Sequence, residues 1–250
     1  MPTHKSLVEP SAEVLAAAHR WIEPVRTALG PEFISAYITG SALTEGFDAA
    51  RSHVNLLVVA RSLAPESLDR VAEAIPESKK PPHFDPMFMT RDQMLSSLDV
   101  FPIEWLDLIE RHLRLDGEDV FPGVEVPLPS LRLQCEHELR GKHVRLRYEY
   151  LASARRPERL AEVLARLTSG FHTLFRTLLR LRGEVPPANH ERVIERVSEM
   201  YGLGAPALLA VLVAHRPSRK ESAAAVRERY RAFLAEINRL VGAIDGLRVS

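Results

Sequence analysis

The sequence contains a single cysteine, Cys135, and this scarcity excludes an intramolecular disulfide. A zinc cluster held by several thiolates is disfavoured for the same reason. The chain also lacks any run of about 18 uninterrupted apolar residues, so no segment has the character of a membrane-spanning helix. Its first residues, MPTHKSLVEPSAEV, lack the apolar core of a signal peptide. We therefore expect a soluble protein of the cytoplasm.

Neither sign of charge is in excess over the whole chain. Lys and Arg number 33 and Asp and Glu also number 33, which gives a formal net charge of zero. Non-specific attraction to nucleic acid or to a membrane is therefore not expected. The hydrophobic fraction of 46% and the charged fraction of 26% are those of an ordinary folded protein, and 250 residues are enough for two small domains.

Charge is nevertheless unevenly distributed along the middle of the chain. Residues 104–125 are rich in Asp and Glu, whereas residues 140–159 are rich in Arg and Lys. Attraction between two domains is the preferred interpretation of these opposite blocks, and phosphate binding by the basic block is the alternative.

The first half of the sequence alternates between helical and strand patterns. Short apolar, β-rich segments such as FISAYIT and VNLLVVA are bounded by turn-forming residues, and apolar residues elsewhere recur at helical spacing. The expected helices cover residues 11–29, 64–75 and 101–112, and the expected strands cover residues 33–39, 54–60 and 87–90.

The second half contains helical patterns only, which predicts an antiparallel helical bundle. Prolines interrupt the chain over residues 123–130, where the strand signals end. We expect an α+β fold with one domain over residues 1–125 and a helical bundle domain over residues 126–250. The expected helices of the bundle cover residues 131–152, 157–183, 189–202, 205–216 and 219–245.

One stretch of the first half, Gly40-Ser41 followed by a loop and then SHVNLLVV, has the layout of a phosphate site. A Gly-Ser turn after a strand lets backbone amides and a hydroxyl approach a phosphate, because glycine has no side chain in the way. In the following strand, residues at positions i and i+2 project from the same face. Nucleotidyl transfer commonly uses two carboxylates at such positions to hold Mg²⁺ ions on a nucleoside triphosphate.

This stretch resembles the signature of the DNA polymerase beta-like nucleotidyltransferase superfamily, which has Gly-Ser, a loop, and then Ser-Asp-(apolar)-Asp. The expected architecture also resembles that of the kanamycin nucleotidyltransferase-like proteins, which join such an α/β domain to a C-terminal helical domain. The resemblance thus covers the whole chain and implies a small mixed sheet with helices, followed by a helical bundle.

Carried over position by position, the resemblance implies that Gly40 and Ser41 lie on the phosphate side. His53 and Asn55 fall on the two metal-ligand positions, and Asp85 is the candidate for a third carboxylate on a later strand. Because Mg²⁺ prefers anionic oxygen ligands, a neutral imidazole and an amide are poor replacements. We therefore expect no bound metal and no cofactor, with Mg²⁺ and a nucleoside triphosphate required only if the chain is an active enzyme.

A metal ion could nevertheless bind with other ligands or another ion in two ways. His53 and Asn55 could bind a softer ion such as Zn²⁺ or Mn²⁺. The loop acids Glu45 and Asp48 could instead supply carboxylates to the site.

The sequence therefore favours a catalytically degenerate nucleotidyltransferase-fold protein that binds a nucleotide or, through its C-terminal helices, another protein. The main alternative is an active enzyme that transfers a nucleoside monophosphate to a small antibiotic-like molecule or to a protein hydroxyl. An RNA-directed module and a purely structural subunit are two further interpretations. The sequence identifies neither the acceptor nor the partner.

Overall fold

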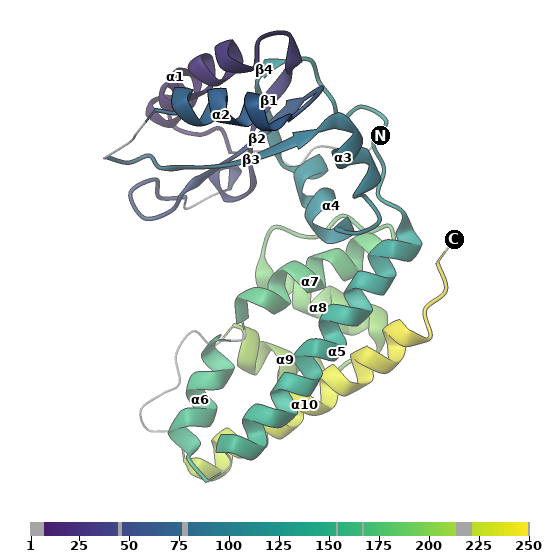
Figure 1. The fold of residues 1–250 in the computed structure, drawn as a ribbon. Coiled ribbons are helices and arrows are strands. Elements are labelled where there is room, and N and C mark those ends of the chain that lie inside the picture. The colour runs from purple at the N-terminus through teal and green to yellow at the C-terminus, as the bar shows by residue number, and fades with distance from the viewer. Residues whose placement is uncertain are drawn as a thin grey trace. The chain divides into compact units, whose positions relative to one another are not determined.

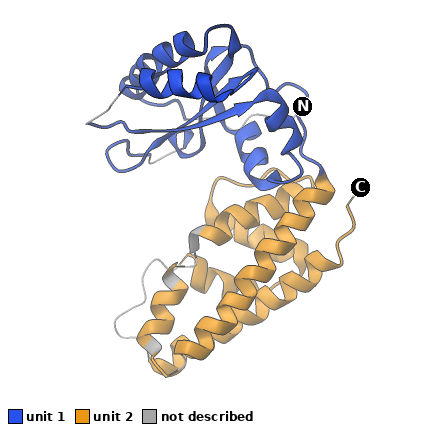
Figure 2. Ribbon diagram, viewed as in Figure 1, with its two compact units in different colours: residues 1–127 blue, residues 128–250 orange. Residues whose placement is uncertain are grey.

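The structure, a computed structural model, describes residues 8–44, 47–76, 80–153, 155–166, 168–213 and 222–249. The chain divides into two compact units, residues 1–127 and residues 128–250 (Figure 2). No helix in the described part of the chain is long and apolar enough to cross a membrane.

The first unit combines a small sheet with helices (Figure 1). Its helices are α1 (Ala12–Leu29), α2 (Pro65–Ala74), α3 (Arg91–Ser96) and α4 (Pro102–Glu110), with short 3₁₀ turns η1 (Gly30–Glu32) and η2 (Gly40–Leu43). Its strands are β1 (Phe33–Thr39), β2 (Val54–Ala60), β3 (Phe84–Thr90) and β4 (His112–Gly117). The predicted α+β fold class is confirmed.

The four strands form one mixed sheet in the order β3-β2-β1-β4. β1 pairs antiparallel with both β2 and β4, whereas β2 pairs in parallel with β3. β1 and β2 are therefore the central strands, which explains why both are apolar almost throughout. β3 lies at an edge of this sheet, where the proline at position 86 is tolerated because an edge strand forms a ladder on one side only.

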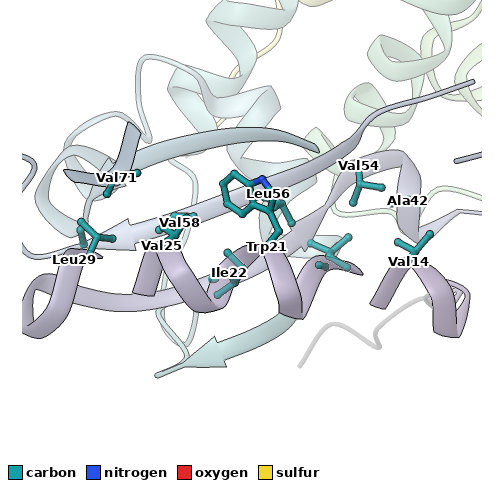
Figure 3. Close-up of a cluster of buried hydrophobic side chains, with 14 of the residues drawn as sticks. Val14, Trp21, Ile22, Val25, Leu29, Ala42, Val54, Leu56, Val58 and Val71 are labelled. Atoms are coloured by element: carbon teal, nitrogen blue, oxygen red, sulfur yellow. The ribbon is translucent and has the colours of Figure 1, made fainter. Parts of the chain in front are cut away.

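One face of the sheet is covered by α1 and α2 (Figure 3). α1 begins at Ser11, whose hydroxyl accepts a hydrogen bond from the Val14 amide at 3.3 Å, and ends at Gly30. Side chains of α1 at helical spacing pack against the inward-facing residues of β2. The buried residues labelled in the figure are Val14, Trp21, Ile22, Val25, Leu29, Ala42, Val54, Leu56, Val58 and Val71.

The opposite face is covered at one end by side chains from α3, α4 and the segment after β4. Met94, Trp105 and Phe121 pack there against Tyr37 and the outward-facing apolar residues of β2. The indole Nε1 of Trp105 donates a hydrogen bond of 2.9 Å to the Ser97 hydroxyl. The apolar layer on this face ends before the sheet does.

The second unit is helical, with its core formed by aromatic and aliphatic side chains. Its helices are α5 (Leu128–Ser153), α6 (Pro157–Arg166), α7 (Thr168–Leu181), α8 (His190–Tyr201), α9 (Ala205–Leu212) and α10 (Ala223–Asp245). Phe171 of α7 packs edge-on against Phe233 of α10 at a centroid distance of 5.4 Å. The Tyr230 hydroxyl of α10 donates to the Leu146 carbonyl of α5 at 2.8 Å.

Several elements differ from the sequence-based expectation. The single helix predicted over residues 157–183 is given as α6 and α7, with Leu167 between them lying outside the described residues. The strand predicted over residues 87–90 begins earlier, at Phe84, and α3 and β4 were not predicted. β4 follows α4 almost directly, so the helical pattern before it concealed the change of secondary structure.

Candidate functional site

The Gly40-Ser41 turn follows β1 directly and contacts the second strand of the motif. Gly40 has a φ of +70°, a left-handed conformation that favours glycine. Its amide donates to the Arg111 carbonyl at 3.4 Å. A Cβ added at Gly40 would lie 3.4 Å from Nδ2 of Asn55. The turn and the motif position on β2 are therefore neighbours.

Strand register places two of the predicted site residues, Asn55 and Asp85, in one row across the sheet. Asn55 pairs with Thr39 of β1 on one side and with Asp85 of β3 on the other. Thr39 in turn pairs with His112 of β4. Because residues that pair across strands share a face, the four side chains form a polar row, Asp85-Asn55-Thr39-His112, on one face of the sheet. We call it the polar row.

The polar row lies on the face that α1 and α2 leave uncovered. Tyr37 and Leu57 stand two residues from Thr39 and Asn55, so they project from the same face and form the apolar end described above. Asn55 and Asp85 are exposed, whereas Thr39 is buried. The row therefore presents an amide and a carboxylate to solvent beside the Gly40 turn.

A second pair of side chains lies next to the row. His53 immediately precedes β2 and His83 immediately precedes β3, and their rings lie 5.8 Å apart in an edge-to-face arrangement. The Val54 amide donates to the His83 carbonyl at 2.8 Å, which fixes the two strand entrances side by side. His83 was not identified from the sequence. The alternation His83-Phe84-Asp85 was the available signal, but it required the parallel pairing of β2 and β3 to be known.

The far end of the row is held by aromatic packing. The His112 ring stacks on Phe121 at 4.1 Å and meets Tyr37 edge-on at 5.4 Å, and its Nδ1 lies 3.0 Å from the Leu108 carbonyl oxygen. The Tyr37 hydroxyl accepts a hydrogen bond of 2.8 Å from the Val120 amide. Burial raises the pKa of Tyr37 above its ordinary value, so this hydroxyl stays neutral.

The loop acid Asp48, considered as a replacement ligand, does not join the row. Glu45 lies outside the described residues. The Asp48 carboxylate accepts from the Ala50 amide at 2.9 Å and pairs with Arg51 Nε at 3.4 Å, both within the loop itself. Asp48 is thus engaged in a local turn.

Metal ligands are sparse in the described part of the chain. No group of three or more His, Cys, Asp or Glu side chains there is arranged to hold a metal ion. The buried Cys135 has its pKa raised to about 12 by burial, so it is a protonated thiol at neutral pH and a poor ligand. The residues that the resemblance places on metal-ligand positions therefore supply one carboxylate, from Asp85.

Comparisons with known proteins give similarities to solved structures. No family model and no curated protein matches the chain. Among solved structures it is similar to the crystal structure of spectinomycin adenyltransferase AAD(9) from Enterococcus faecialis with ATP and spectinomycin, at 13% identity over 94% of this chain and 100% of that chain, with a TM-score of 0.47. At this identity and TM-score the similarity assigns neither a family nor an activity.

The arrangement has a definite chemical character. A glycine turn with an exposed serine, two neighbouring imidazoles and an exposed amide all offer hydrogen-bond donors. The single carboxylate of the row offers little to a divalent cation, which needs several anionic oxygens. The site is suited to an oxyanion more than to a magnesium ion.

Proposed function

We propose that this chain is a nucleotidyltransferase-fold protein that binds the phosphate groups of a nucleotide and has lost the metal-dependent transfer reaction. The observation that carries the proposal is the contact of Gly40 with Asn55, which in turn pairs with Asp85. The motif positions lie together, as the resemblance implies for a working site, but only one of them is a carboxylate.

The binding role follows from the donors around the turn. Ser41 is exposed, and no interaction of its side chain occurs within the described residues. His53 and His83 would present ring N–H groups to the same ligand. Phosphate oxygens accept hydrogen bonds from such groups without a bridging cation. We assign Gly40 and Ser41 to the phosphate side of the nucleotide and treat His53 and His83 as supporting donors.

The loss of catalysis follows from charge. Two carboxylates at positions 53 and 55 would add about two negative charges for holding Mg²⁺, and His53 and Asn55 supply none. Without the cations, the α-phosphorus is not activated and the leaving pyrophosphate is not stabilised.

Calorimetric titration tests this proposal. ATP and the other nucleoside triphosphates are titrated into the protein with Mg²⁺, with Mn²⁺, and with EDTA. Binding that persists in EDTA and weakens in a Ser41→Ala variant supports the proposal. Binding that requires Mg²⁺ contradicts the loss of metal chemistry, and the absence of binding under all three conditions contradicts a nucleotide site.

One observation favours the alternative of an active enzyme. Asp85 pairs directly with Asn55 on the neighbouring strand, where a carboxylate could share a metal ion with a ligand on β2. An active nucleotidyltransferase would release pyrophosphate when supplied with a triphosphate, Mn²⁺ or Mg²⁺, and an acceptor hydroxyl. A coupled pyrophosphate assay over aminoglycosides and protein substrates distinguishes this enzyme from a binding protein.

We further propose that the two compact units are separate domains, with nucleotide binding assigned to the first. The helical unit then remains available for a protein partner.

A further inference from the structure

α5 is apolar on two opposite sides. One side carries the buried residues Leu131, Cys135, Leu139 and Leu146, which pack inside the helical unit. On the other side Val144, Tyr148 and Leu151 follow the i, i+4, i+7 spacing of one helix face, and their exposed fractions are 65%, 67% and 79%. A helix at a protein surface normally needs only one apolar side. The second side therefore calls for a separate explanation.

Arginines surround this exposed side. Arg145 and Arg147 alternate with its apolar residues, and Arg155 and Arg156 follow the end of the helix. All four are exposed, and none forms an ion pair within the described residues. Earlier in the same helix the pattern differs, because Arg140 pairs with Glu136 and Asp245 and Lys142 pairs with Glu138. Among the described residues of α5, the Arg and Lys side chains without an ion pair, Arg145 and Arg147, are thus those beside Val144, Tyr148 and Leu151.

We propose that this surface docks an acidic amphipathic helix of a partner protein. The docking surface, called the α5 stripe, consists of Val144, Tyr148 and Leu151 with Arg145, Arg147, Arg155 and Arg156. The partner helix would place apolar side chains against the first three and Asp or Glu against the arginines. Apolar contact and charge complementarity then act together, as in other helix-on-helix recognition.

The charge of the α5 stripe argues against a second copy of the chain. Two stripes placed face to face would bring the four arginines of each copy together, and residues 144–158 hold only two acids, Glu149 and Glu158, to offset them. Like charges at an interface are unfavourable. An acidic partner removes this repulsion.

The apolar residues argue against nucleic acid and membrane. Phosphates would pair with the arginines but would leave Val144 and Leu151 without apolar contacts. The three apolar residues span seven positions of one helix, about 10 Å, which matches the face of a single partner helix. A bilayer surface would favour a wider apolar face.

The test uses the full chain and a labelled synthetic peptide of about 20 residues. The peptide has a leucine stripe at i, i+3, i+4 and i+7 and glutamates on either side of it. Two control peptides keep its length: one has lysines in place of the glutamates, and the other has the same composition in scrambled order. Binding is measured by fluorescence anisotropy at low and high salt. We expect the acidic peptide to bind more tightly than both controls, and to bind less tightly as salt screens the charges.

Two double variants test the two components of the surface. Tyr148→Ser with Leu151→Ser removes apolar contacts, and Arg145→Glu with Arg147→Glu reverses charge. Each should weaken binding of the acidic peptide by about tenfold or more, as expected for residues central to an interface. The matched control is Val185→Ser with Arg192→Gln, which changes an exposed valine and an exposed arginine outside the α5 stripe and should leave the affinity unchanged.

Four results would overturn the proposal. The first is failure of the acidic peptide to bind the wild-type chain, and the second is unchanged binding in both stripe variants. The third is a dimer in analytical ultracentrifugation that the stripe variants dissociate. The fourth is stripe-dependent binding of poly(A) RNA or of phosphatidylserine vesicles that is tighter than peptide binding. The peptide comparison on the wild-type chain remains decisive if a variant fails to fold. These variants lie in the helical unit, so we expect them to leave nucleotide titration unchanged, and failure here is then distinguishable from failure of the nucleotide proposal.

Discussion

The two faces of the four-stranded sheet differ in how fully apolar side chains cover them. On the face under α1, Val54, Leu56 and Val58 are all buried. On the other face the same strand presents buried Leu57 but exposed Asn55. Alternate residues of β2 thus separate a complete core from a polar site. We therefore expect substitutions one residue apart to alter the core and the polar row independently.

The largest effect is expected at the covered face. Leu56→Ala should lower the free energy of unfolding by about 2–5 kcal/mol, because it leaves a cavity between β2 and α1. Urea denaturation measures the change. The matched control is Asn55→Ala at the neighbouring exposed position on the opposite face, which should change the free energy of unfolding by no more than about 0.5 kcal/mol. A loss below about 1 kcal/mol for Leu56→Ala would show that the core under α1 is not the closely packed side.

The next largest effect on stability is expected at Tyr37, which lies where the apolar end of this sheet face meets the polar row. Tyr37→Phe should cost about 1–3 kcal/mol, because the Val120 amide loses its acceptor in a buried position. The loss should also depend on pH. Burial raises the pKa of Tyr37 above its ordinary value of 10.0, so the unfolded chain releases this proton first as the pH rises.

The hydroxyl of Tyr37 therefore contributes stability below about pH 10 that disappears at higher pH. Urea denaturation of the wild type and of Tyr37→Phe between pH 8 and pH 11 measures the difference. The stability gap between them should narrow in the alkaline range. Because Tyr201 and Tyr230 also have raised pKa values, only the gap between the two proteins is informative. A gap that stays constant to pH 11 would contradict the assignment.

A smaller effect is expected at the turn beside the polar row. Gly40→Ala should destabilise by about 1–2 kcal/mol, because an L side chain is strained at a φ of +70°. The control is Gly141→Ala in the middle of α5, where an added Cβ meets nothing within 4 Å. That substitution should stabilise by up to about 1 kcal/mol, because alanine favours helices. Thermal unfolding of both variants compares the two glycines directly.

The smallest effect on stability is expected at the exposed end of the polar face. His53→Asp with Asn55→Asp should destabilise by only a few tenths of a kcal/mol, through repulsion with Asp85. Mg²⁺ should then raise the melting temperature of the double variant but not that of the wild type, because bound ligand stabilises the folded state. Adding Asp85→Asn should abolish the response. A folded double variant that ignores both Mg²⁺ and nucleotide would show that the phosphate pocket itself is lost.

Local signals were sufficient for the centre of the first unit. The apolar segments around Tyr37 and Leu57 are bounded by glycines and polar residues, and the strands found there have the predicted bounds. The helix α1 was equally clear, because its apolar residues recur at helical spacing and Gly30 follows the last of them.

The edges of the sheet were less predictable because their structure depends on distant partners. β3 contains Pro86, and a proline predicts that a strand is interrupted. It is accepted here only because β3 is an edge strand. β4 ends at Gly117, where a Cβ would lie 2.0 Å from the Ile34 carbonyl oxygen. That close approach of two backbones has no local signal. The neighbourhood of His53 and His83 depends on the same parallel pairing, so it was not predicted either.

The strand order also determines when each strand can pair with its neighbours as the chain is synthesised. β1 is made first and acquires β2 from the segment directly after it, but its other neighbour, β4, is made only after α2, β3, α3 and α4. One edge of the central strand therefore stays without hydrogen-bond partners while most of the first unit leaves the ribosome. Unpaired edges invite pairing with other chains. A nascent chain that stalls before residue 112 should therefore be the form most prone to aggregation and most dependent on chaperones.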